Sequence, residues 1–170
     1  MLLPPAFGET VSTYQLAQLN IATLLAPLDS PQLAGFVDAL DRINALAEAT
    51  PGFVWRLKDE GGDATAIRHF GDDVIVNMSV WKGIDALHDY VYRSDHAQIF
   101  KRRREWFARM ADAYMVLWWV PAGHVPTLAE AAGKLALLQR LGPTPDAFTF
   151  RDPCPPPDAV GTQTAADALP

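Results

Sequence analysis

A chain of 170 residues, 49% of them hydrophobic and 20% charged, can bury one domain core and does not have the composition of a disordered protein. Its net charge of −6 disfavours nucleic acid as a partner, and no apolar run is as long as the roughly 18 residues of a membrane-spanning helix. The single cysteine, Cys154, excludes an internal disulfide and a multi-cysteine zinc site, so we expect a cytoplasmic protein.

The first half of the chain predicts strands on either side of one helix. Ser30-Pro31 is a typical helix start, because a hydroxyl cap and a proline suit the first turn, and Thr50-Pro51-Gly52 ends the apolar stripe that follows. After an irregular arm over 1–13, the predicted elements are a strand over 14–20, this helix, and strands over 53–58 and 65–81, the last interrupted at 71–73.

The second half predicts two short helices, a fourth strand and a capped helix. Residues 113–120 are apolar on both faces, as in a central strand, and Thr127 and Glu130 form a capping box. The predicted elements are helices over 83–92 and 94–110, a strand over 113–120, a helix over 127–141, a short added strand over 147–151 and a proline-rich mobile tail over 153–170.

This order of elements, β-α-β-β-α-β, is the split βαβ or ferredoxin-like arrangement of the α+β class, an antiparallel sheet with helices on one face. We expect one such domain over 14–152. Val76, Met78 and Val80 make the other face apolar, so we expect a homodimer whose sheets pack face to face. The alternative is that the C-terminal helix covers this face within one chain.

The helix over 94–110 places two basic side chains on its apolar face. At helical spacing, His96 and Arg103 share that face with Phe100 and Trp106, which are candidates for binding a substrate. The other basic residues of the run KRRRE point outward as a solvated face, which disfavours a nucleic-acid site.

Two interpretations of the inward basic residues stay open. A permanently charged guanidinium on a buried stripe needs an anionic partner. For Arg103 this partner is either structural (Asp38, Asp41 or Asp112) or the carboxylate, enolate or phosphate of a ligand. His96 is either a hydrogen-bonded core histidine or a base or ligand.

A second semi-buried histidine, His88, lies on the apolar face of the preceding helix. Two histidines on adjacent helices can bind a metal, but no carboxylate spacing or HExxH motif accompanies them. We therefore expect no metal site.

Polar residues on the strand over 74–81 offer hydrogen bonds to a ligand. Asn77 and Trp81 share one strand face, with Ser79 between them, and Asn20 ends the first strand. If that face meets the helices, these side chains lie near His96. The alternative for Asn77 and Trp81 is a strand-end cap and core packing.

Several strings of the sequence, spread over 14–152, resemble a known family. They are LAQLN, INALAEATPGFVWRL, VNMSVW, YVYRSDH, KRRREWF and LWWVPAGHVPT. They are similar to a bacterial domain-of-unknown-function family in the dimeric α+β-barrel superfamily, alongside the antibiotic-biosynthesis monooxygenases. The close family implies no activity.

The wider superfamily implies candidate activities. Its cofactor-free oxygenases act on electron-rich polyphenols with an Asn and a Trp four residues apart, a spacing that Asn77 and Trp81 match. Other relatives bind haem through a helix histidine, which implies a role for His96 or His88, and others are cyclases or isomerases.

We therefore expect a small-molecule-binding α+β barrel that, if it is an enzyme, acts as a cofactor-free monooxygenase on a phenolic or enolic metabolite. In that mechanism Arg103 or His96 stabilises the deprotonated substrate, and Asn77 and Trp81 orient a peroxy intermediate, while Asn20 and Ser79 contact the substrate. The alternatives are haem binding, a cyclase or isomerase, and a non-enzymatic dimeric binding or scaffold protein.

Overall fold

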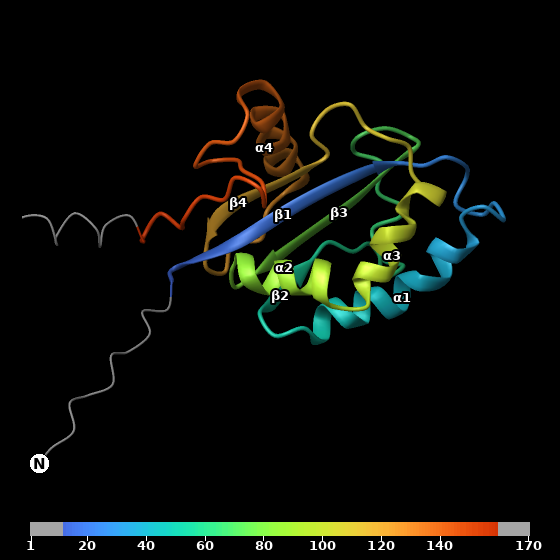
Figure 1. The fold of residues 1–170 in the computed structure, drawn as a ribbon, viewed down its shortest axis with the longest axis horizontal. Coiled ribbons are helices and arrows are strands. Elements are labelled where there is room, and N and C mark those ends of the chain that lie inside the picture. The colour runs from blue at the N-terminus through green and yellow to red at the C-terminus, as the bar shows by residue number, and fades with distance from the viewer. Residues whose placement is uncertain (1–11, 160–170) are drawn as a thin grey trace, which may run out of the picture.

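The computed structural model describes residues 12–159 (Figure 1). The expected arm over 1–13 and mobile tail over 153–170 thus lie largely outside the described residues. The elements are β1 (Tyr14–Thr23), α1 (Ala34–Ala49), β2 (Phe53–Arg56), β3 (Val74–Trp81), α2 (Ile84–Arg93), α3 (His96–Arg102), a single 3₁₀ turn η1 (Arg103–Glu105), β4 (Met115–Pro121) and α4 (Leu128–Leu141). None of the described helices is long and apolar enough to cross a membrane.

The four strands form one antiparallel sheet in the order β2-β3-β1-β4. This order confirms the predicted ferredoxin-like α+β fold. The strand β1 lies between β3 and β4, and its register places Asn20 opposite Asn77 and Gln18 opposite Ser79. Polar residues from two neighbouring strands therefore meet on one face.

That face packs against α1 and α2. Trp81 and Leu117 of the sheet form an apolar cluster with Ala47 of α1 and Leu87 of α2. Figure 1 shows α1, α2 and α3 together on this side of the sheet and α4 on the other.

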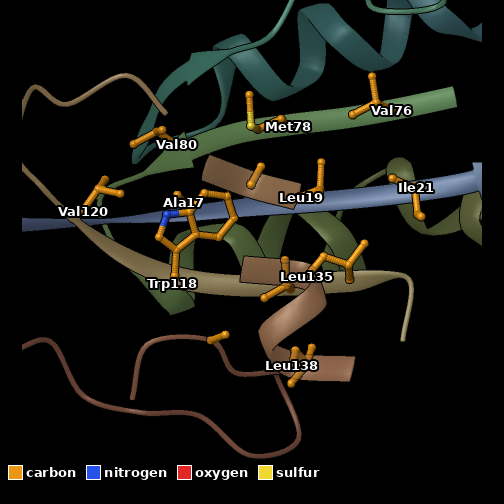
Figure 2. Close-up of a cluster of buried hydrophobic side chains, with 13 residues drawn as sticks. Ala17, Leu19, Ile21, Val76, Met78, Val80, Trp118, Val120, Leu135 and Leu138 are labelled. Carbon is orange, nitrogen blue, oxygen red and sulfur yellow. The ribbon is translucent and has the colours of Figure 1, made fainter. Parts of the chain in front are cut away.

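The opposite face is buried within the single chain. Leu135 and Leu138 of α4 lie over it, as Figure 2 shows, and the segment that follows β2 adds Ile67 and Phe70. Met78 is only 2% exposed. The sequence left open that the C-terminal helix covers this face within one chain. This arrangement is the one observed, because α4 covers the face. The homodimer stays a prediction, and its interface has to use another surface.

Two predicted helix boundaries were wrong. The helix α1 begins at Ala34, and the buried hydroxyl of Ser30 has no hydrogen-bond partner among the described residues. The helix α3 ends at Arg102, because residues 106–108 pair with the end of β1 and the two residues after it. Leu25 N–H donates to the Trp106 carbonyl over 2.9 Å, and Ala108 N–H donates to the Thr23 carbonyl over 2.9 Å.

Strand predictions after β2 were also too long. The first part of the strand predicted over 65–81, before its interruption at 71–73, is a loop. Its turn is fixed by the Asp63 carboxylate, which accepts from the backbone N–H and the hydroxyl of Thr65. The added strand over 147–151 reduces to isolated bridges, of Phe148 with Leu117 and of Ala147 with Thr144.

The helix α4 confirms its predicted start. The Thr127 hydroxyl accepts a hydrogen bond from Glu130 N–H over 3.1 Å.

The beginning of the proline-rich segment is anchored by two hydrogen bonds. The Cys154 carbonyl accepts from Trp119 Nε1 over 2.8 Å, and the Asp158 carboxylate accepts from Thr13 N–H over 2.7 Å.

Candidate functional site

A cavity of about 200 Å³ lies between the sheet and the helices α1 and α3. It forms where β2 has ended, because β2 pairs with β3 only from Trp81 to Ser79 and leaves the first half of β3 without that neighbour. Apolar side chains of α1 and α3, among them Leu40, Ile43 and Ile99, line it together with polar groups from the sheet. An apolar cavity with a few convergent polar groups is typical of a small-molecule site.

The cavity brings together five of the residues singled out in the sequence. They are Asn20, Asn77, His96, Phe100 and Arg103. The sheet face that carries Asn20 and Asn77 and the apolar face of α3 therefore meet at this cavity. The structure does not test their roles.

Four other candidates do not line the cavity. Trp81 and Trp106 are each 1% exposed and Ser79 is buried, so all three lie in the core. His88 of α2 does not line the cavity and contacts the rings of Tyr92 and Phe150.

His96 is fixed in one neutral form. Its Nδ1 lies 3.2 Å from the Val91 carbonyl oxygen, which can only accept, so Nδ1 carries the proton and Nε2 keeps a free lone pair. Burial lowers the pKa of His96, although the bond to Val91 opposes this shift. A neutral imidazole with a free Nε2 can act as a general base at neutral pH.

The turn between α2 and α3 explains this placement. The Ser94 hydroxyl donates to the Tyr90 carbonyl and accepts from His96 N–H over 3.1 Å. The Tyr90 ring lies 4.8 Å from the His96 ring and 5.1 Å from that of Trp81. His96 therefore sits between the aromatic core and the cavity.

Arg103 lacks a carboxylate partner among the described residues. None of Asp38, Asp41 and Asp112, the structural partners considered in the sequence, pairs with it. Its Nη1 donates to the Phe100 carbonyl over 2.8 Å, and the guanidinium lies 4.1 Å from the centre of the Phe100 ring. Most of its five N–H donors stay available for an anion.

Two more arginines line the cavity. Arg104 is exposed and has no ion pair among the described residues, while Arg56 is paired with Glu48 over 2.8 Å. Asp63 also lines the cavity, so with Arg56 paired to Glu48 the side chains of Arg103 and Arg104 leave a small positive excess in an acidic protein. Such a charge distribution attracts an anionic ligand.

The amide oxygen of Asn77 accepts a hydrogen bond from Gln18, a residue that the sequence analysis did not single out. Gln18 Nε2 donates to Asn77 Oδ1 over 2.5 Å and to Ser79 Oγ over 3.0 Å. Trp81 Nε1 donates to the same hydroxyl over 2.8 Å. The alternation of β1 places Gln18 on the same face as Asn20, and this alternation is the sequence signal that could have singled out Gln18.

Haem does not fit this site. Of the two histidines considered for it, only His96 lines the cavity, and its free Nε2 is of the kind that binds iron. The cavity, about 200 Å³, is smaller than the roughly 300–1,000 Å³ of sites for drug-sized ligands, and haem is larger still. The described residues also contain no cluster of His, Cys, Asp and Glu that could hold a metal ion.

Comparison with known proteins finds one family. Residues 15–164 match the family described as a domain of unknown function, DUF3291. No curated protein matches the sequence.

Several solved structures are similar to this chain at a low level. A protein of unknown function from Nitrosomonas europaea, NE2512, is 16% identical and has a TM-score of 0.42, covering 68% of this chain and 97% of its own. SnoaB, a cofactor-independent oxygenase from Streptomyces nogalater, is 19% identical with a TM-score of 0.41, covering 67% and 96%. PA3566 from Pseudomonas aeruginosa is 16% identical with a TM-score of 0.40, covering 68% and 100%. These values carry no argument about function.

Proposed function

The chain belongs to the DUF3291 family, as its sequence led us to expect, and we propose that it binds a small phenolic or enolic metabolite that carries an anionic group. The observation that carries this proposal is the pairing, in one cavity, of His96 with a free Nε2 and Arg103 without a carboxylate partner. Apolar walls favour one or two rings, and the basic residues favour a negative charge.

The same groups support an enzymatic role. The His96 Nε2 takes the proton of the phenol or enol, and Arg103 stabilises the resulting anion, whose charge is delocalised over oxygen and carbon. Because His96 is neutral at pH 7, it needs no further activation. Asn77 and Asn20 contribute neutral hydrogen-bonding groups at the sheet end of the cavity.

The reaction that we propose is cofactor-free oxygenation. The electron-rich anion gives one electron to O₂, and the substrate radical and superoxide combine to form a C–O bond. The peroxide anion takes back the proton from His96 and becomes a hydroperoxide. His96 then removes the proton of the para C–H as the O–O bond breaks, and hydroxide leaves with that proton as water, so that a phenol with a free para C–H and one O₂ yield a quinone and one H₂O. The Asn77 carboxamide donates to the peroxy oxygen; Trp81 does not touch the cavity and has no direct role.

Binding is tested with 1-hydroxy-2-naphthoate, which is fluorescent and combines two rings, a phenol and a carboxylate. We expect saturable binding that is weakened in Arg103→Gln and unchanged in Arg140→Gln. The control removes the same charge from α4, on the far face of the sheet. The absence of saturable binding, or equal weakening in both variants, would contradict the proposal.

Catalysis is tested by oxygen uptake with a panel of naphthols, catechols and hydroquinones. We expect uptake that requires His96 and is lost in His96→Gln but kept in His69→Gln, whose side chain is exposed. Conversion that proceeds equally without O₂ would instead indicate a cyclase or isomerase. Binding without conversion would indicate a non-enzymatic binding protein.

A further inference from the structure

Gln18 and Ser79 are the only buried polar side chains among residues 12–159, each with 6% exposure. They face one another across β1 and β3, between the apolar cluster around Trp81 and the pair Asn20 and Asn77 on the same sheet face. An unsatisfied polar group in such a place costs stability, so a buried amide retained here needs hydrogen-bond partners. Its partners connect it to the cavity.

The hydrogen bonds connect four side chains, and Ser79 Oγ accepts from two of them. The indole N–H of Trp81 can only donate, and it donates to Ser79 Oγ. Gln18 uses both N–H groups of its Nε2, one toward Ser79 and one toward Asn77 Oδ1. The carbonyl oxygen of Asn77 is therefore occupied, which leaves its NH₂ group as the part that is free to donate.

We propose that Gln18 is a positioning residue that presents the NH₂ group of Asn77 to an oxygen acceptor of the ligand. Trp81 does not line the cavity, and it reaches Asn77 through these hydrogen bonds, by way of Ser79 and Gln18. Asn77 lines the cavity and is exposed at the point where β2 no longer covers β3. This inference rests on the proposed function, since the acceptor belongs to the proposed ligand.

The test is a double-mutant cycle on the binding of 1-hydroxy-2-naphthoate. Gln18→Met keeps the length of the side chain and removes both donors. We expect it to weaken binding about two- to tenfold in the wild-type background, the range that one net hydrogen bond gives. In an Asn77→Ala background we expect no further loss, because the group that Gln18 orients is absent.

The matched control is Gln98→Met, which changes an exposed glutamine on α3. It should leave binding unchanged in both backgrounds. Gln18→Met losing the same factor with and without Asn77 would overturn the proposal, since a general loss of packing acts on both backgrounds alike. A full effect of Gln18→Met without any effect of Trp81→Phe or Ser79→Ala would overturn the part assigned to Trp81.

A measurement without ligand separates this inference from the proposed function. In ¹⁵N NMR spectra, the side-chain NH₂ of Asn77, identified by its loss in Asn77→Ala, should be rigid in the wild type and become mobile in Gln18→Met. If the probe does not bind the wild type, the proposed function fails and this NMR result alone decides whether Gln18 holds Asn77. Equal mobility in the two proteins would contradict the positioning role.

Discussion

The Nδ1 of His96 lies 3.2 Å from the carbonyl oxygen of Val91, and this contact between the end of α2 and the start of α3 sets the tautomer of the one histidine in the cavity. A carbonyl cannot donate, so the proton stays on Nδ1 and the lone pair on Nε2. The contact thus links the geometry of a short turn to acid–base chemistry, and the first predictions follow from it.

The rate of the proposed reaction should fall only at acidic pH. Burial lowers the pKa of His96 below its ordinary value of 6.5, so its base form persists below that pH. We expect the acid limb of kcat/KM for oxygen uptake to have its midpoint below pH 6.5. The direct check is the titration of the His96 ring by NMR, and a midpoint above 6.5 would refute the assignment.

The free energy of unfolding should also depend on His96. Its pKa is lower in the folded chain than in the unfolded chain, so between these two values the unfolded chain binds more protons. This contribution to stability is complete above pH 6.5 and is lost as the pH falls through the pKa of the folded state. Urea unfolding measures this free energy between pH 7.5 and 5. Over this range it should decrease less in His96→Gln than in the wild type, whereas His69→Gln should show the same decrease as the wild type.

Replacement of Arg103 should discriminate between charged and neutral ligands. Hydrogen bonds to charged groups contribute about 1.5–3 kcal/mol, so Arg103→Met should weaken the binding of 1-hydroxy-2-naphthoate by roughly tenfold to a hundredfold. The methyl ester of the same compound should lose much less affinity. Fluorescence titration of both compounds measures this, and an equal loss for the two would show that Arg103 acts through packing alone.

Glu130 should stabilise the far face of the sheet. Its carboxylate accepts from Trp118 Nε1 over 2.9 Å and lies 2.7 Å from His124 Nε2. Burial raises its pKa, but the bonds from His124 and Trp118 outweigh this and lower the pKa of Glu130 overall. Glu130→Ala leaves the indole N–H of a tryptophan that is 1% exposed without a partner, which costs about 1–3 kcal/mol.

Chemical denaturation measures that cost. Glu130→Gln keeps an acceptor for Trp118 and should lose less stability than Glu130→Ala. An alanine at the exposed Glu60 serves as the control and should be close to neutral. Equal stability of all three variants would show that the buried indole does not depend on Glu130.

Haem should not bind through His96. The cavity is too small for a tetrapyrrole, so titration of the purified protein with haem should give no Soret band that depends on this residue. The comparison is wild type against His96→Ala. A band present in the first and absent in the second would show that the cavity opens to admit haem.

Much of the fold was predictable because its signals are local. Alternation along β1 and β3 put Asn20 and Asn77 on the sheet face that meets the helices, and helical spacing put His96 of α3 and Arg103 of η1 on one side. Capping signals were less reliable. Thr127 starts α4 as predicted, whereas Ser30 is followed by turns with hydrogen bonds three residues apart and α1 begins only at Ala34.

The sequence by itself determined the ferredoxin-like order of elements and the faces on which the polar residues lie, since both depend on periodicities within single segments. Only the tertiary structure decided that α4 covers the second face, that Trp81 is sealed in the core, and that Gln18 holds Asn77. These outcomes depend on strand register and on which segments pack together. Such contacts join residues as far apart as Gln18 and Asn77, and no pattern within one segment encodes them.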